Sequence, residues 1–99
     1  MSDEDYLSVV RNRIQTARIS KELRQEDMAD LLGMSVRSYQ RYEGASTLKL
    51  FNPYLTTLRR IAVALEVDIA RLVGEPSPRE LEDLRTKPQR QRVRRSWSR

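Results

Sequence analysis

The sequence predicts an all-α fold of five helices, followed by a short sixth helix or linker and a basic, flexible tail. Apolar residues recur at three- and four-residue spacing, which is typical of helices with one buried face. Capping residues and glycines divide the chain into segments of helical length. A chain of 99 residues allows one small domain with tails. We expect the domain over 1–74, the linker or extra helix over 75–86, and a disordered tail over 87–99.

The first helix is predicted from about Asp3 to Lys21. Ser2 and Asp5 match the capping-box pattern, in which the two residues exchange hydrogen bonds at the start of a helix. The apolar residues of its core face are Tyr6, Leu7, Val10, Ile14 and Ala17. We expect Leu23 to fill the core before the next helix begins.

Two short helices joined by a glycine turn are predicted over about 25–32 and 36–43. Gly33 ends the first, because glycine takes a left-handed backbone without steric cost, and Ser35 is a good N-cap for the second. The residues expected on their buried faces are Met28, Leu31 and Leu32, then Tyr39 and Tyr42. Such a unit can place a helix in the DNA major groove, although ordinary helical hairpins share its pattern.

The outward face of the second of these helices is polar, with Arg37, Ser38, Gln40 and Arg41. Arg37 and Arg41 are four residues apart and therefore share one side of the helix. Arginine can bond guanine O6 and N7 together, and glutamine suits adenine. This face carries the donors that read base edges; the alternative is a polar, solvated surface.

Two more helices are predicted after a loop over 44–52. Asn52 and Pro53 fit the N-cap and first position of the fourth helix. Its expected buried stripe is Leu55, Leu58, Ile61, Ala62 and Leu65. Asp68 is expected to cap a fifth helix that ends at Gly74 and carries Ile69, Leu72 and Val73. In the loop, Leu48, Leu50 and Phe51 either tie the chain to the core or form a short extended piece.

A second capping-box pattern, Ser77 with Glu80, predicts one more helix over 78–86. Leu81 and Leu84 give this helix a narrow apolar side. Either these leucines dock on the domain or on a partner subunit, or the helix is frayed and has no packing role.

From Ile14 to Gly74 the chain resembles the XRE-like, lambda-repressor-like family of Cro/repressor-type helix-turn-helix DNA-binding domains. The matching residues are Arg18, Leu23, Gln25, Ala29, Leu32, Gly33, Ser35, Tyr42 and Glu43, followed by PYLTTLRRIAVALEVDIARLVG. Two positions depart from the family pattern. Arg24 stands where the family usually has a capping serine or threonine, and Glu66 stands where it often has glycine. We therefore expect a weaker cap at Arg24, with its hydrogen bonding left to Gln25 or water. At Glu66 we expect a strained or less tight turn, and no change of fold.

The resemblance implies a role for individual residues. It implies base contacts from Val36, Arg37, Gln40 and Arg41. It implies that Arg24, Gln25, Ser38 and Lys49 lie against phosphates, with a solvated helix start as the alternative for Gln25. Arg18 and Glu43 match a partly buried ion pair that holds the recognition helix at its angle; the alternative is two unpaired surface charges.

Composition excludes several classes of function. The chain has neither cysteine nor histidine, which removes disulfides, thiolate and triad catalysis, and the usual zinc sites. A carboxylate-only cation site at Asp3, Glu4 and Asp5 is less favoured than a charged helix start. We expect no enzyme activity, no cofactor, no metal and no small-molecule ligand. No membrane-spanning run or signal peptide is seen, so we expect the cytoplasm of a prokaryotic cell or phage-infected host.

The positive charge is concentrated in the tail. Six of the 19 basic residues lie in 87–99 with no acid, whereas 1–86 carries the other 13 and all 14 acidic residues. Arg90, Arg92, Arg94, Arg95 and Trp97 therefore suggest a non-specific nucleic-acid arm. The alternative is a solvated tail without function.

These observations predict a sequence-specific DNA-binding transcriptional regulator, of the phage- or plasmid-type repressor class, that occupies an operator on double-stranded DNA. One such unit reads only a few base pairs, so a homodimer on two half-sites is expected. One alternative is the antitoxin of a toxin–antitoxin pair that autoregulates its promoter. Another is a protein-interaction module whose basic tail alone touches nucleic acid.

Overall fold

The computed structural model describes residues 1–44 and 52–86, and within them all regular structure is helical, as predicted. The elements are α1 (Asp3–Ser20), α2 (Gln25–Leu32), α3 (Val36–Gln40), the 3₁₀ turn η1 (Arg41–Glu43), α4 (Leu55–Leu65), α5 (Ile69–Val73) and α6 (Pro78–Thr86). Lys49 and the expected loop anchors lie outside the described residues, as does the basic tail.

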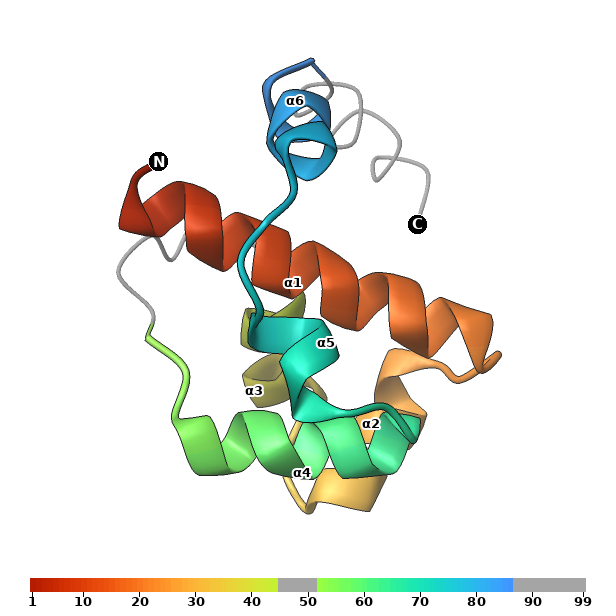
Figure 1. The fold of residues 1–99 in the computed structure, drawn as a ribbon. Helices are drawn as coiled ribbons and strands as arrows, with labels where there is room; N and C mark the ends of the chain where they lie inside the picture. Colours follow the sequence, from red (N-terminus) through yellow and green to blue (C-terminus); the bar gives the residue numbers. More distant parts are fainter. Residues whose placement is uncertain (45–51, 87–99) are drawn as a thin grey trace.

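The helices surround one core. Helix α1 crosses the middle of the molecule, with α3, α4 and α5 on one side of it and α6 on the other (Figure 1). Helix α2 packs on α3 and α4. The largest fully buried side chains are Val10, Ile14, Met28, Tyr39, Ile61, Leu65 and Leu72. Because they come from five different helices, burying them fixes how α2 and α3 sit on the rest of the domain.

The predicted capping residues explain where α1 and α3 start and where α2 ends. Ser2 Oγ accepts a hydrogen bond from the Asp5 backbone N–H at 3.0 Å, and Ser35 Oγ accepts one from the Ser38 N–H at 3.0 Å. Gly33 takes the left-handed conformation expected of it, with φ at 70°. These local features confirm the predicted starts of α1 and α3 and the predicted end of α2.

The start of α2 differs from the expectation for Arg24. The Asp27 carboxylate, and not Gln25, accepts a hydrogen bond from the Arg24 backbone N–H at 2.8 Å. The Arg24 side chain makes no capping bond to the helix, since a guanidinium has no acceptor. It pairs instead with Asp27, at 3.2 Å.

The prediction that Leu31 belongs to the buried stripe of α2 was wrong, since Leu31 is 61% exposed. The buried residues of α2 are Met28, Ala29 and Leu32. At 100° per residue these three occupy one arc of the helix, and Leu31 falls outside it. A second difference is that α3 ends at Gln40, and its last turn tightens into η1.

The prediction that α4 starts at Asn52 and Pro53 was also wrong, because the helix starts at Leu55. Tyr54 is the N-cap, and its extended backbone (φ −74°, ψ 141°) prevents any earlier start. Leu55 is thus the first helical residue, beyond the packed part of α4, and is 67% exposed instead of buried. The rest of the predicted stripe is buried: Leu58, Ile61, Ala62 and Leu65.

The turn between α4 and α5 is strained as predicted. Glu66 adopts the left-handed conformation, with φ at 62°, which is costly for any residue with a Cβ. Asp68 is the N-cap of α5, but its side chain makes no capping bond, contrary to the expectation. Gly74 follows α5, and a Cβ there would lie 2.9 Å from the Ala70 carbonyl oxygen. Glycine is therefore required by space at this position.

The predicted sixth helix is present, and its capping box is complete. The Ser77 backbone N–H donates to Glu80 Oε1 at 2.9 Å, and the Glu80 N–H donates to Ser77 Oγ at 3.1 Å. Helix α6 packs against α1, with Leu81 and Leu84 half-buried. This arrangement agrees with docking on the chain's own domain.

Candidate nucleic-acid interface

The candidate interface consists of the start of α2 and the outward face of α3 and η1. Tyr39 and Tyr42 are buried and anchor α3 and η1 to the core. Arg37 and Arg41 are exposed, and Ser38 is half-exposed. The structure thus brings the predicted polar side chains to one outward surface, carried by a short helix whose other face is packed.

Behind this surface lies the Glu43 carboxylate, which accepts four hydrogen bonds. Arg18 supplies two of them, from Nε to Oε2 at 2.6 Å and from Nη2 to Oε1 at 3.1 Å. The Tyr39 hydroxyl donates to Oε2, and Gln25 Nε2 donates to Oε1 at 3.1 Å. A carboxylate offers about four acceptor positions, so that of Glu43 is fully used. The predicted pair of Arg18 and Glu43 is present.

This cluster is buried. The Glu43 side chain is 2% exposed and that of Arg18 is 11% exposed. Burial, and next the hydrogen bond to Glu43, raise the pKa of Tyr39, so the phenol stays protonated as a donor. Arg18 Nη1 also donates to the Leu23 carbonyl at 2.7 Å. The cluster therefore ties α1, the turn before α2, α2 itself and α3 into one unit.

Gln25 and Gln40 lie between this cluster and the surface. Gln40 Nε2 donates to Gln25 Oε1 at 3.0 Å, while Gln25 Nε2 donates to Glu43. Both glutamines are half-buried. Gln25 was expected against a phosphate, and in this structure its side chain is bonded within the domain. Gln40, expected at a base, is held in place through Gln25.

The other predicted contact residues have local roles as well. Val36 is half-buried and packs against the core, leaving only part of its side chain outward. Ser35 Oγ donates to Ser38 Oγ at 3.1 Å, so the hydroxyl of Ser38 belongs to the start of α3. Arg24 is exposed beside Asp27. All three remain near the start of α2 or α3, where a backbone phosphate could approach.

Sequence reasoning missed three contacts that hold this surface in place. Tyr39 and Glu43 are four residues apart, so their contact on one helical face could have been found. Gln25 and Gln40 come from different helices, and no sequence spacing indicates their bond. Arg60 on α4 donates a hydrogen bond to the Leu32 carbonyl, and this bond ties the end of α2 to α4.

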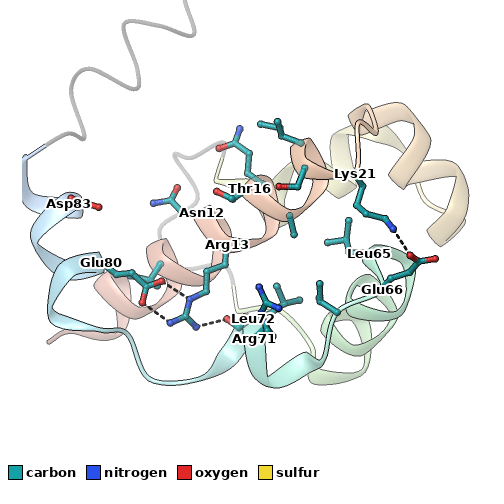
Figure 2. A pocket seen from close by; sticks show the side chains of 16 residues that line it. Asn12, Arg13, Thr16, Lys21, Leu65, Glu66, Arg71, Leu72, Glu80 and Asp83 are labelled. Carbon is teal, nitrogen blue, oxygen red and sulfur yellow. Dashed lines mark hydrogen bonds and ion pairs between the residues drawn. The ribbon is translucent and has the colours of Figure 1, made fainter.

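A groove lies on another face, between α1, the α4–α5 turn and α6 (Figure 2). It is an open groove of about 730 Å³. The Lys21–Glu66 ion pair lies near one end and the Arg13–Glu80 ion pair near the other (Figure 2). Leu65 and Leu72 contribute apolar lining.

Arg13 holds the segment that leads to α6. Its Nε and Nη2 donate to the two Glu80 oxygens at 2.8 and 2.9 Å. Its Nη1 donates to the carbonyls of Leu72 and Gly74 at 3.0 and 2.7 Å. The hydrogen bond from Arg13 is the main reason that the pKa of Glu80 falls to about 2.

The fold and the surface together define a small helical domain with an outward polar helix held by a buried polar cluster. The chain is 33% identical over 75 residues to the Cryptic phage CTXphi transcriptional repressor RstR of Vibrio cholerae serotype O1. The match spans 76% of this chain but 63% of that protein, which is less than two thirds of its length. No family model matches the chain, and no solved structure does.

Within residues 1–44 and 52–86, no helix is both long enough and apolar enough to cross a membrane.

Proposed function

We propose that this protein is a sequence-specific DNA-binding transcriptional regulator of the XRE-like helix-turn-helix type, a phage- or plasmid-type repressor that occupies an operator. The observation that carries the proposal is the outward polar face of α3, backed by the saturated Glu43 cluster. Reading a base edge requires side chains held in a fixed position and orientation. The buried ion pair between α1 and η1 would hold the recognition helix in this way. The phage repressor among its relatives supports the same conclusion.

The proposed chemistry follows from side-chain geometry. Arg37 and Arg41 would each bond guanine O6 and N7, and Gln40 would bond adenine. The exposed part of Val36 would touch a thymine methyl group. Arg24 and the hydroxyl of Ser38 lie near helix starts, where backbone N–H groups favour phosphate. The protein would act in the cytoplasm of a prokaryotic cell or infected host.

The part of the chain before the basic tail has little net charge to attract DNA by itself. Residues 1–86 carry 13 basic and 14 acidic side chains, a net charge of −1. Attraction to phosphates must therefore come from where the arginines lie, or from the six basic residues of 87–99. We propose that the tail adds non-specific affinity and that α3 adds the sequence preference.

Selection from random DNA with the full chain tests this proposal. We expect one enriched sequence, with two half-sites about one helical turn apart if the chain binds as a dimer. Arg37→Ala should change the enriched sequence. Arg79→Ala, which removes the same charge from the exposed surface of α6, should not. Binding to all sequences alike would contradict a sequence-specific regulator.

A further inference from the structure

A chain of hydrogen bonds leads from the buried carboxylate to the candidate DNA-facing amide. Glu43 Oε1 accepts from Gln25 Nε2 at 3.1 Å, and Gln25 Oε1 accepts from Gln40 Nε2 at 3.0 Å. These three side chains come from η1, α2 and α3. The bonds run in one direction, from the amide of Gln40 inward to the carboxylate.

The direction is forced by chemistry. A carboxylate paired with a guanidinium only accepts hydrogen bonds, and Glu43 already accepts two from Arg18. The group of Gln25 that faces Glu43 must therefore be its nitrogen, which leaves its oxygen facing Gln40. The group of Gln40 that faces Gln25 must in turn be nitrogen. Turning either amide around would place oxygen against oxygen or nitrogen against nitrogen and lose a bond.

The same direction determines what Gln40 presents outward. Its amide has one oxygen and two N–H donors, and one donor is used by Gln25. In the part of the chain that the structure describes, its oxygen and second N–H have no other bond. A glutamine without such a neighbour can turn its amide by half a turn and exchange donor and acceptor. Gln40 cannot do so without breaking the bond to Gln25.

We propose that Glu43, acting through Gln25, sets the order of donor and acceptor on Gln40 and so determines which orientation of an A·T pair this residue accepts. The inference rests on the proposed function. Adenine presents the N7 acceptor and the N6 amino donor side by side in the major groove, whereas thymine presents O4 and a methyl group. A fixed amide matches adenine on one strand only. Gln25 and Glu43 are thus positioning residues for specificity, and Gln40 is the residue that contacts the base.

The test compares Gln25→Leu with Gln40→Ala in random-DNA selection with the full chain. Gln40→Ala identifies the base pair that Gln40 reads, because preference there is lost. Gln25→Leu should reduce the same preference from about tenfold to about threefold or less, and leave the other base pairs unchanged. The double variant should lose no more than Gln40→Ala. Gln15→Leu, on the groove face of α1, is the matched control and should keep every preference.

The outcomes separate this inference from the proposed function. If Gln40→Ala loses a preference that Gln25→Leu retains, the inference is overturned and the proposed function stands. If Gln25→Leu weakens binding equally on all sequences, Gln25 holds a phosphate and the inference is again overturned. If the unmodified chain prefers no sequence, the proposed function fails, and the inference fails with it.

A measurement on the unmodified protein covers the case in which Gln25→Leu fails to fold. One side-chain amide proton of Gln25 should exchange with solvent at least about tenfold more slowly than those of Gln15, because it is bonded to a buried carboxylate. Equal exchange rates at the two glutamines would show that Gln25 is not held and would overturn the inference.

Discussion

The Arg18–Glu43 pair and the Arg13–Glu80 pair both join α1 to other helical elements, and they differ mainly in burial. Arg18 and Glu43 have side chains that are 11% and 2% exposed, whereas those of Arg13 and Glu80 are 17% and 36% exposed. Both arginines make two bonds to their carboxylate. The buried pair is surrounded by Tyr39 and Gln25 and supports the candidate DNA-binding helix, while the other attaches a helix on the far side of α1.

The comparison shows how the same bond can have different consequences. A buried charge that loses its partner cannot recover the missing interaction from water, so breaking such a pair is costly. A carboxylate at the surface is solvated when its partner is removed, and the loss is small. We therefore expect changes at Glu43 to affect the whole domain, and changes at Glu80 to affect α6.

The largest effect is expected for Glu43→Ala, at about 3–5 kcal/mol of unfolding free energy. The change leaves Arg18 buried without its partner and removes the acceptor of Tyr39 and Gln25. DNA binding should weaken at the same time, since α3 loses its support. Denaturant unfolding of Glu43→Ala, Arg18→Ala and the double variant should show coupling between the two sites. Strictly additive effects would argue against the Arg18–Glu43 pair. Glu80→Ala, which breaks the more exposed Arg13–Glu80 pair, is the matched control.

Arg37→Ala and Arg41→Ala should each cost about 1–3 kcal/mol of binding at the preferred site. Each should also relax preference at one base pair, and the melting temperature should hardly change because both side chains are exposed. Titrations on the preferred and a scrambled sequence measure this. Equal weakening on both sequences would show that these arginines hold phosphates only.

Acid should weaken the attachment of α6 through Glu80. Its pKa in the folded protein is about 2, below the ordinary 4.5, so its contribution is fully present above about 4.5 and is lost as the pH falls toward 2. Glu80→Gln cannot titrate in this range. The difference in melting temperature between the unmodified chain and Glu80→Gln should therefore shrink between pH 4.5 and pH 2. A constant difference across that range would exclude Glu80 as the titrating group.

The smallest effect on the fold is expected for deletion of 87–99, which removes six basic residues. The melting temperature should hardly move. Binding to specific and random DNA should weaken by similar factors, because arginines that contact phosphates carry no sequence information. The slope of log K against log salt should become shallower by about 0.9 for each phosphate that the tail neutralises in the full chain. An unchanged slope would assign the tail to another partner.

Much of the fold follows from local sequence signals. Ser2, Gly33, Ser35 and Ser77 predicted helix ends correctly, because each acts within a few residues of itself. The errors arose where local spacing competes with packing. Leu55 has the right spacing for the α4 stripe, but Tyr54 delays the helix and leaves it at the exposed end.

The same distinction between local signals and long-range packing applies to the candidate site. The outward residues of α3 could be predicted from helical periodicity, and Arg18 with Glu43 from the family resemblance. The bond between Gln25 and Gln40, and the bonds of Arg13 to Glu80 and to the carbonyls before α6, join helices distant in sequence. Such bonds depend on how the helices are placed, and no spacing along the chain reveals them.

In the proposed function, α3 is held by Glu43 and is the surface that meets DNA. The most direct test is to follow backbone amide signals by NMR while the selected DNA is added to the full chain. The largest changes should fall at the start of α2 and on α3 and η1, including Gln25, Arg37, Gln40 and Arg41. Residues of the far groove and α6, such as Asn12 and Arg79, should change little. Largest changes on α6 or in that groove would contradict the account.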